Sequence, residues 1–253
     1  MRRPLVEVTA AGAQLTGTFL TLPGATSAEL LAEPFDLVLI DLEHGALGPL
    51  EAQEMILGAQ AAGVFALVRL PADAYGLMTA VLDAGADGVV LADVADAATA
   101  QRAVERMSHP PDGMRGWGPR RLTLRQRGEG RRPPRPALWV QIESTEGVEN
   151  AAMIASIPGV DVMLVGTADL SFSVGTPLDT TTSEVRAGVA AVRVAAEAAG
   201  VVFGVAGALD AAPAEIRAGA SVLVHSTDAR LCADAVDGAA AWLRSAFPSG
   251  SRP

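Results

Sequence analysis

The sequence contains no lysine: all 19 of its basic residues, in a chain of 253, are arginine. Without a lysine side chain the protein cannot form a Schiff base with a carbonyl substrate, anchor pyridoxal phosphate or build a Walker-type phosphate loop. Carbonyl chemistry in this chain would therefore have to stabilise negative charge with other groups, and a bound metal ion is the group that the sequence favours.

Cysteine is nearly absent as well, and the N-terminal region has no long apolar run. The single cysteine, Cys232, excludes an intramolecular disulfide and a thiolate metal cage, and we do not expect it to be a catalytic thiol. Residues 1–7 turn from basic to acidic without the apolar stretch of a signal peptide, so the sequence predicts a cytoplasmic protein with no membrane partner. The formal charge of -10 argues against a nucleic-acid partner.

Apolar material is plentiful, with 50% of the residues hydrophobic and 19% charged, which is enough for a large core. Short apolar, strand-like runs alternate with helical patterns, several of which end at a glycine such as Gly63, Gly200 or Gly219. The strand-like runs cover residues 17–22, 36–42, 65–70, 88–92, 138–143, 161–166, 201–205 and 221–225. The clearest helical patterns cover residues 50–62, 97–107, 148–157, 184–199 and 213–218.

This alternation predicts a single (β/α)8 barrel, also called a TIM barrel, over residues 1–253, since such barrels need about 250 residues. A doubly wound open sheet has the same alternation and is the alternative. No Gly-rich dinucleotide fingerprint follows the first strand, where residues 22–26 form a turn with one glycine. The barrel is therefore the favoured fold.

One segment departs from the pattern. Residues 115–136 are rich in arginine and end in a run of prolines, which indicates a long loop. Two interpretations stay open: an arginine-lined lid that attracts an anionic substrate, or a solvated surface that contacts another subunit.

Polar residues cluster where several predicted strands end. The second strand ends in Asp41 and leads to His44, the third ends near Arg69, the fifth leads to Glu143, and the sixth leads to Asp169. Each residue alone has an ordinary structural explanation, such as capping a helix or pairing with an arginine. Because the carboxyl ends of all barrel strands meet at one face, their convergence there predicts an active site.

The chemistry of these residues favours a hard metal ion. Carboxylates without a cysteine or a histidine pair suit Mg2+ or Mn2+, although Co2+ and Zn2+ stay open. Of the other histidines, His109 precedes two prolines and is predicted to be structural, whereas His225 ends the last strand and is predicted to face the mouth of the site.

At these residues the sequence resembles the HpcH/HpaI aldolase family, the class II pyruvate aldolases, over nearly its whole length. Six blocks in the same order carry the resemblance, which makes it far more specific than a single motif. They are residues 36–44 (DLVLIDLEH), 68–71 (VRLP), 82–86 (LDAGA), 110–116 (PPDGMRG), 140–143 (VQIE) and 168–171 (ADLS).

The resemblance implies roles for individual residues. His44, oriented by Asp41, would be the general base, Arg69 would stabilise an enolate oxygen, and Asp83 would reach a neighbouring subunit's site. Glu143 and Asp169 would hold the divalent metal, which chelates pyruvate or a related 2-oxo acid. The substrate carboxylate would be seated by Gln141 and by the backbone of Gly166, Thr167 and Ala168.

The function implied is reversible cleavage of a 4-hydroxy-2-oxo acid to pyruvate, or a related 2-oxo acid, and an aldehyde through a metal-stabilised enolate. The family also implies a homo-oligomer, a hexamer or trimer, in which the last helix, near residues 233–247, packs on a neighbour. Thr167 stands where the family usually has proline, and residues 225–227 are also unusual. These departures predict an altered aldehyde pocket, and the loop from Arg115 to the strand of Glu143, which is shorter and richer in arginine than is typical of the family, predicts an unusual, acidic acceptor.

Two other functions are kept as alternatives. A lyase of the citryl- or malyl-CoA type would use similar residues, with the arginine segment holding the CoA phosphates, and CoA-dependent turnover would distinguish it. A barrel that has lost activity and serves in binding or assembly is the second alternative, because a fold does not guarantee a reaction.

Overall fold

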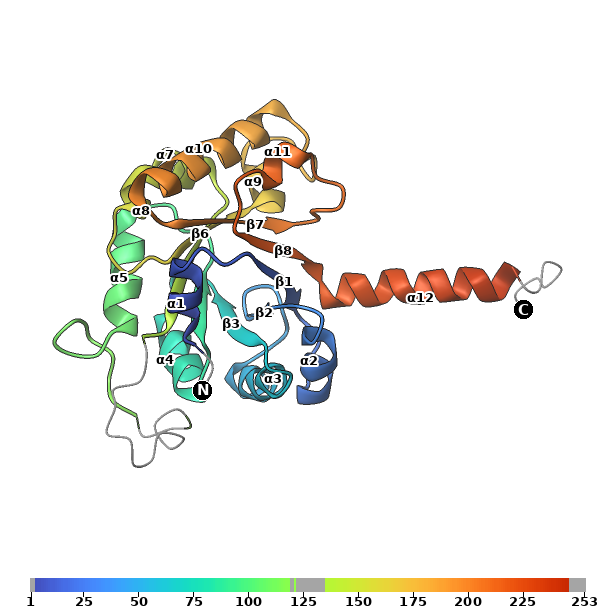
Figure 1. Cartoon of the computed structure of the whole chain (residues 1–253), viewed down its shortest axis with the longest axis horizontal. Coiled ribbons are helices and arrows are strands. Elements are labelled where there is room, and N and C mark those ends of the chain that lie inside the picture. The colour runs from blue at the N-terminus through green and yellow to red at the C-terminus, as the bar shows by residue number, and fades with distance from the viewer. Residues whose placement is uncertain (1–2, 119–120, 122–134, 246–253) are drawn as a thin grey trace.

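The computed structural model describes residues 3–118, 121 and 135–245. Eight parallel strands pair in sequence order, and β8 pairs with β1, so the sheet closes into a barrel (Figure 1). The predicted barrel is confirmed, and the open sheet is excluded. The strands are β1 (Leu15–Leu20), β2 (Leu37–Asp41), β3 (Phe65–Leu70), β4 (Gly88–Leu91), β5 (Ala137–Ile142), β6 (Val162–Gly166), β7 (Val202–Gly207) and β8 (Val222–Thr227).

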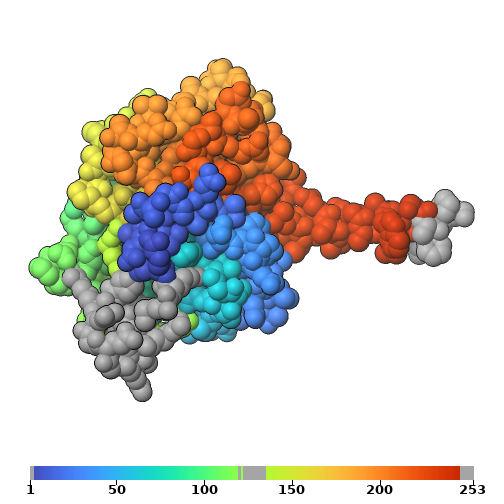
Figure 2. All heavy atoms as spheres, in the orientation of Figure 1, coloured from blue at the N-terminus to red at the C-terminus, as the bar shows by residue number. Residues whose placement is uncertain are grey.

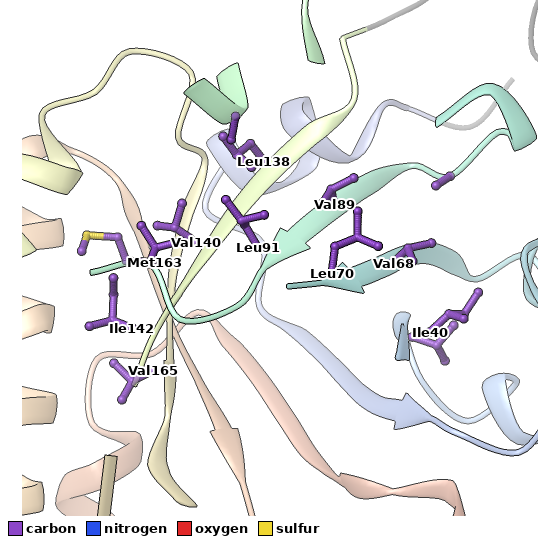
Figure 3. Packing of buried hydrophobic residues seen from close by; sticks show 14 of the residues in the cluster. Ile40, Val68, Leu70, Val89, Leu91, Leu138, Val140, Ile142, Met163 and Val165 are labelled. Carbon is purple, nitrogen blue, oxygen red and sulfur yellow. The ribbon is translucent and has the colours of Figure 1, made fainter. Parts of the chain in front are cut away.

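The strands are apolar on both faces because each face packs in a separate core. On β2, for example, Leu37 and Leu39 belong to the cluster inside the barrel, while Val38 and Ile40 belong to the cluster between the strands and the helices. Figure 3 shows side chains of the outer cluster from several strands. This two-sided burial explains why the strands are nearly continuous runs of hydrophobic residues.

Helices surround the sheet, as Figure 1 shows. They are α1 (Leu5–Ala10), α2 (Ala25–Ala32), α3 (Pro49–Ala61), α4 (Tyr75–Ala84), α5 (Ala97–Met107), α7 (Thr145–Glu149), α8 (Ala151–Ala155), α9 (Thr167–Ser173), α10 (Ser183–Ala199), α11 (Ala214–Arg217) and α12 (Asp228–Ser245). The predicted glycine ends are confirmed, because Gly63, Gly200 and Gly219 all have positive φ. The helix predicted at 148–157 is instead two short helices that meet at Asn150.

The two ends of the chain take different positions. Leu5 of α1 is buried in the interior cluster with Leu15 and Phe65, near the N-terminal ends of their strands, so α1 closes that end of the barrel. In contrast, α12 projects away from the barrel as an arm (Figures 1 and 2). Among the described residues, no helix is both long and apolar enough to cross a membrane.

Most of the arginine-rich segment lies outside the described residues, so the prediction of either a lid or a subunit-contacting surface is not tested. Three of its arginines are described, and each is engaged. Arg115 pairs with Asp83, Arg121 donates to the carbonyl of Ala84 and to Gln60, and Arg135 pairs with Asp161.

Candidate active site

A buried ion pair joins the ends of β2 and β3. Asp41 and Arg69 are register partners on adjacent strands, so their side chains point to the same side of the sheet. Arg69 binds Asp41 with two hydrogen bonds, Nε to Oδ1 at 2.9 Å and Nη2 to Oδ2 at 2.6 Å. Burial pushes the pKa of Asp41 upward, but the hydrogen bonds and charge of Arg69 outweigh it and hold that pKa below its ordinary value.

The same pair shapes the turn that carries His44. Asp41 Oδ1 also accepts hydrogen bonds from the backbone amides of Glu43, at 3.1 Å, and His44, at 3.3 Å. The predicted effect of Asp41 on His44 therefore acts through the backbone, while the ring Nε2 lies 3.8 Å from Oε2 of Glu43. Burial, the largest cause, raises the pKa of Glu43 despite the nearby positive charge of Arg69. The imidazole is exposed, so a substrate can reach it.

A second group of polar residues surrounds Glu143, directly after β5. Its Oε1 accepts a hydrogen bond from the backbone amide of Asp93 at 2.7 Å, and its Oε2 accepts one from Nε2 of Gln141. A Cβ atom on Gly166 would lie 2.5 Å from that Oε2, so any other residue at this position would push the carboxylate away from β6. Asp93 has a positive φ of 45°, a conformation that aspartate tolerates better than most residues.

The electrostatics of this group suit a cation. Burial raises the pKa of Glu143 to about 8, and the charges of Asp169 and Glu43 add to the rise. Gln141 Oε1 and Glu43 Oε2 are buried and have no hydrogen-bond donor among the described residues. Within that same part of the chain, no three His, Cys, Asp or Glu side chains form a metal-binding group. The two neighbouring carboxylates of Glu143 and Asp169 would suit a hard divalent cation that keeps positions open for water and substrate.

A cavity of about 320 Å³ opens at this face of the barrel. Most of the predicted site residues line it: His44, Arg69, Gln141, Gly166, Thr167, Ala168 and Asp169. Asp41 and Glu143 stand behind this wall, bound to Arg69 and Gln141 respectively. Arg69 uses Nε and Nη2 for its ion pairs, so among the described residues its Nη1 has no hydrogen-bonding partner and is available to a ligand.

Three other residues lie away from this cavity. Asp83 on α4 binds Nη2 of Arg115 at 2.7 Å and does not line the pocket of its own chain, so its predicted role at a neighbour's site stays a prediction. His109 donates a hydrogen bond from Nδ1 to the carbonyl of Arg115 and packs on Trp117, in keeping with a structural role. His225 does not line the pocket, because its Nδ1 accepts a hydrogen bond from the amide of Leu209.

Sequence reasoning missed several residues of the site. The ring of Phe19 lies 4.4 Å from the Arg69 guanidinium, and Arg230 of α12 lines the pocket. Phe19 gives no polar signal in the sequence, and Arg230 is one arginine among many on helices. Asp93 contributes only its backbone amide, which no residue pattern reveals. The prediction relied on polar side chains at the ends of strands, and none of these three residues contributes to the site in that way.

Comparisons with known proteins agree on one family. The model of the HpcH/HpaI aldolase/citrate lyase family matches residues 16–235. A hydroxypyruvate/pyruvate aldolase from Rhizorhabdus wittichii is 34% identical over 188 residues, 72% of this chain and 74% of the relative. A 4-hydroxy-4-methyl-2-oxoglutarate aldolase from Chaetomium globosum is 36% identical over 151 residues, 56% of each chain. A crystal structure of an HpcH/HpaI aldolase/citrate lyase family protein from Burkholderia cenocepacia superposes with a TM-score of 0.87 at 29% identity, covering 95% of this chain and 98% of that one.

Proposed function

This chain belongs to the HpcH/HpaI aldolase/citrate lyase family and is a carbon-carbon lyase of the aldolase type, and we propose that it cleaves 4-hydroxy-2-oxo acids to pyruvate, or a related 2-oxo acid, and an aldehyde. The observation that carries the proposal is a cavity lined by an exposed imidazole, an arginine with a free Nη1 and the carboxylate of Asp169, with the carboxylate of Glu143 close behind the wall. Names of relatives, a hydroxypyruvate/pyruvate aldolase among them, support a 2-oxo acid as one product.

His44 is the group placed to move the proton. In the cleavage direction it takes the proton of the 4-hydroxyl group, the C4–O bond becomes a carbonyl, and the C3–C4 bond breaks. The electron pair of that bond becomes the enolate of pyruvate, and a proton is then added to C3. Glu43, whose Oε2 lies 3.8 Å from Nε2, is the acidic group beside this ring.

Arg69, together with a cation held by two carboxylates, would stabilise the enolate. Arg69 is held by Asp41 at Nε and Nη2, so Nη1 is fixed in orientation before substrate binds. When bound, a divalent cation at Glu143 and Asp169, Mg2+ or Mn2+ by the chemistry of these oxygen ligands, supplies Lewis-acid stabilisation of the negative oxygen. With no lysine in the chain, these residues have to do what a Schiff base does in other aldolases.

The wall of β5 and β6 seats the 2-oxo acid. Gln141 is almost fully buried and lines the cavity beside Gly166. Thr167, next in the chain, donates its hydroxyl to the carbonyl of Ala206 at 3.0 Å, which ties the backbone of residues 166–168 to β7. We infer that this backbone and Gln141 hold the substrate carboxylate.

Cleavage of a panel of 4-hydroxy-2-oxo acids tests the proposal, with pyruvate release measured after EDTA and after adding Mg2+ or Mn2+. We expect turnover to require the metal and to fall at least about 100-fold in Glu143→Gln and in Asp169→Asn, because each removes charge that holds the cation. A matched control, Glu197→Gln on α10, lies outside the cavity and should retain turnover. Cleavage only of acyl-CoA substrates would instead support a citryl- or malyl-CoA type of lyase.

A further inference from the structure

The residues used in the proposed reaction occupy only part of the cavity wall. They come from β2, β3 and the ends of β5 and β6, whereas the remaining wall comes mainly from β7, β8 and the start of α12. That second wall consists of Ala206, Gly207, Ala208, Ser226, Thr227 and Arg230. A 2-oxo acid held against Gln141 and Asp169 leaves this wall to face the aldehyde portion of the substrate.

The second wall combines space, hydroxyl groups and one positive charge. Ala206, Gly207 and Ala208 have small or absent side chains, which leaves room between β7 and the centre of the cavity. The cations that line the cavity are Arg69 and Arg230. Arg69 is paired with Asp41, and its remaining Nη1 serves the enolate in the proposed reaction, so Arg230 is the cation left to meet a second charge on the substrate.

A bulge in β8 turns the two hydroxyl residues toward the cavity. Gly17 and Phe19 of β1 are partners of Val224 and Thr227, so two steps on β1 match three on β8. The extra residue places Ser226 at a φ of 57°, in the left-handed region that serine rarely adopts. Ser226 and Thr227 therefore both line the cavity instead of alternating, as bulges near active sites often allow.

The start of α12 is fixed, and Arg230 with it. Thr227 caps the helix, because its Oγ1 accepts a hydrogen bond from the amide of Arg230 at 3.2 Å. Asp228 is 1% exposed, and its carboxylate accepts hydrogen bonds from Thr21 and Leu22 of the loop after β1. The backbone that carries Arg230 is thus anchored to the barrel, although the rest of α12 projects from it (Figure 1).

The guanidinium of Arg230 makes only one weak contact within the protein. Its Nε lies 3.4 Å from Oδ2 of Asp234, an exposed contact one turn along the helix, with side chains 71% and 64% exposed. Among the described residues its two Nη groups have no hydrogen-bonding partner. An exposed pair of this kind contributes little energy, so a carboxylate entering the cavity can compete with Asp234 for Arg230.

Resting on the function proposed above, we propose that Arg230 selects acceptors with an anionic group, so that the substrate is a 4-hydroxy-2-oxo acid with a second carboxylate at the end released with the aldehyde. Two Nη donors suit the two oxygens of a carboxylate, and Ser226 and Thr227 provide further hydrogen-bonding groups beside it. The small residues of β7 make room for the carbon chain between the reacting carbon and that carboxylate.

The test compares acceptors of equal size in aldol synthesis with pyruvate: succinate semialdehyde against 4-methylpentanal, and glyoxylate against 2-methylpropanal. In the wild-type protein, kcat/KM should favour the anionic aldehyde of at least one pair. Arg230→Gln should lower that preference about 10- to 100-fold, as expected for a charge-assisted hydrogen bond. Arg230→Lys should retain most of it, and Arg244→Gln, which removes the same charge from the exposed far end of α12, should leave it unchanged.

Binding to the metal-free protein separates this inference from the proposed reaction. The Kd of succinate semialdehyde, measured by ligand-observed NMR, should rise about 10-fold in Arg230→Gln and should not change in Arg244→Gln. If this Arg230-dependent binding is found but no aldol chemistry occurs, the reaction is wrong and the anion site stands. Equal binding of succinate semialdehyde and 4-methylpentanal by the wild-type protein, or binding that is unchanged in Arg230→Gln, would overturn the inference.

Discussion

Asp41 binds one side chain and two backbone amides at once, which makes it a support for the site as well as part of it. It holds Arg69 in a bidentate pair and orders the turn that carries His44. Both members of the pair are nearly buried, at 1% and 7% exposed. Removing one charge would leave the other in the interior without compensation.

We therefore expect Asp41→Asn to cost about 3 to 5 kcal/mol in the free energy of unfolding at pH 7. Because the pKa of Asp41 is lowered in the folded state, this contribution is complete above the ordinary pKa of an aspartate and is lost as the pH falls through the lowered value. Urea unfolding at pH 7 and at low pH measures both effects, and the gap between the two proteins should narrow in acid. Glu197→Gln, which breaks a partly exposed pair with Arg193, should cost less than about 1 kcal/mol. Equal costs for the two variants would show that the buried pair does not support the fold.

Glu143 has the opposite effect on stability. Its pKa is raised to about 8 by burial and by neighbouring carboxylates, so the folded protein binds a proton that the unfolded chain releases near pH 4.5. The cost of its charge therefore grows as the pH rises from about 4.5 to about 8 and then stays constant, at about 1.4 kcal/mol for each pKa unit.

Glu143→Gln should therefore raise the Tm of the metal-free protein at pH 8.5, by about 2 to 4 °C for each kcal/mol recovered, with little change at pH 4. Added Mg2+ or Mn2+ should raise the Tm of the wild-type protein and leave that of the variant almost unchanged, since ligand binding stabilises only a protein that binds it. Thermal unfolding of both proteins, followed by circular dichroism at each pH and with each metal, measures these effects. A variant with a lower Tm than the wild type at pH 8.5 would show that the buried charge of Glu143 does not destabilise the metal-free protein.

At the residue scale, the sequence predicted the polar side chains at strand ends but not their contacts. Gln141 and Asp169 line the cavity as expected, because parallel strands bring their carboxyl ends together. The contact of Asp41 with the backbone of His44 depends on the conformation of a turn, which the residue types alone do not fix.

At the scale of elements, strands were predicted more accurately than helices. The strand-like run at 65–70 coincides with β3, whereas α9 was not predicted as a helix. Short helices such as α9 carry too few turns for an apolar period to stand out. The bulge in β8 was also missed, because it depends on how that strand meets β1 across the closure of the barrel.

The arm formed by α12 is the element that makes a further prediction. Its side chains Val236, Trp242 and Leu243 are 65%, 71% and 54% exposed, although the helix is amphipathic. A soluble monomer rarely leaves such residues uncovered on a projecting helix. We propose that α12 packs on a second copy of the chain in a hexamer or trimer, as the family resemblance predicts.

Light scattering on the purified protein tests this arrangement. We expect the mass of a trimer or hexamer for the wild type and a smaller mass for Trp242→Glu, which places a charge in the proposed contact. Val194→Glu on α10 alters a residue of similar exposure, 59%, and should keep the wild-type mass. A monomer for the wild-type protein would contradict the proposal.

At the scale of the whole molecule, the two ends of the barrel have different roles. The end near the start of the strands is closed by α1 and packed with apolar side chains, while the other end holds the charged groups around the cavity. Around that cavity, one sector carries the groups for enolate formation and the other carries small residues, hydroxyls and Arg230. The first sector is the part that all aldol substrates of this enzyme would share.

Enolate formation can therefore be measured without knowing the aldehyde. Exchange of the pyruvate methyl protons in D2O, followed by NMR with Mg2+ or Mn2+ and again after EDTA, tests it directly. We expect exchange that requires the metal and is lost in His44→Ala. Absence of exchange with every metal, or exchange that persists in His44→Ala, would contradict that expectation.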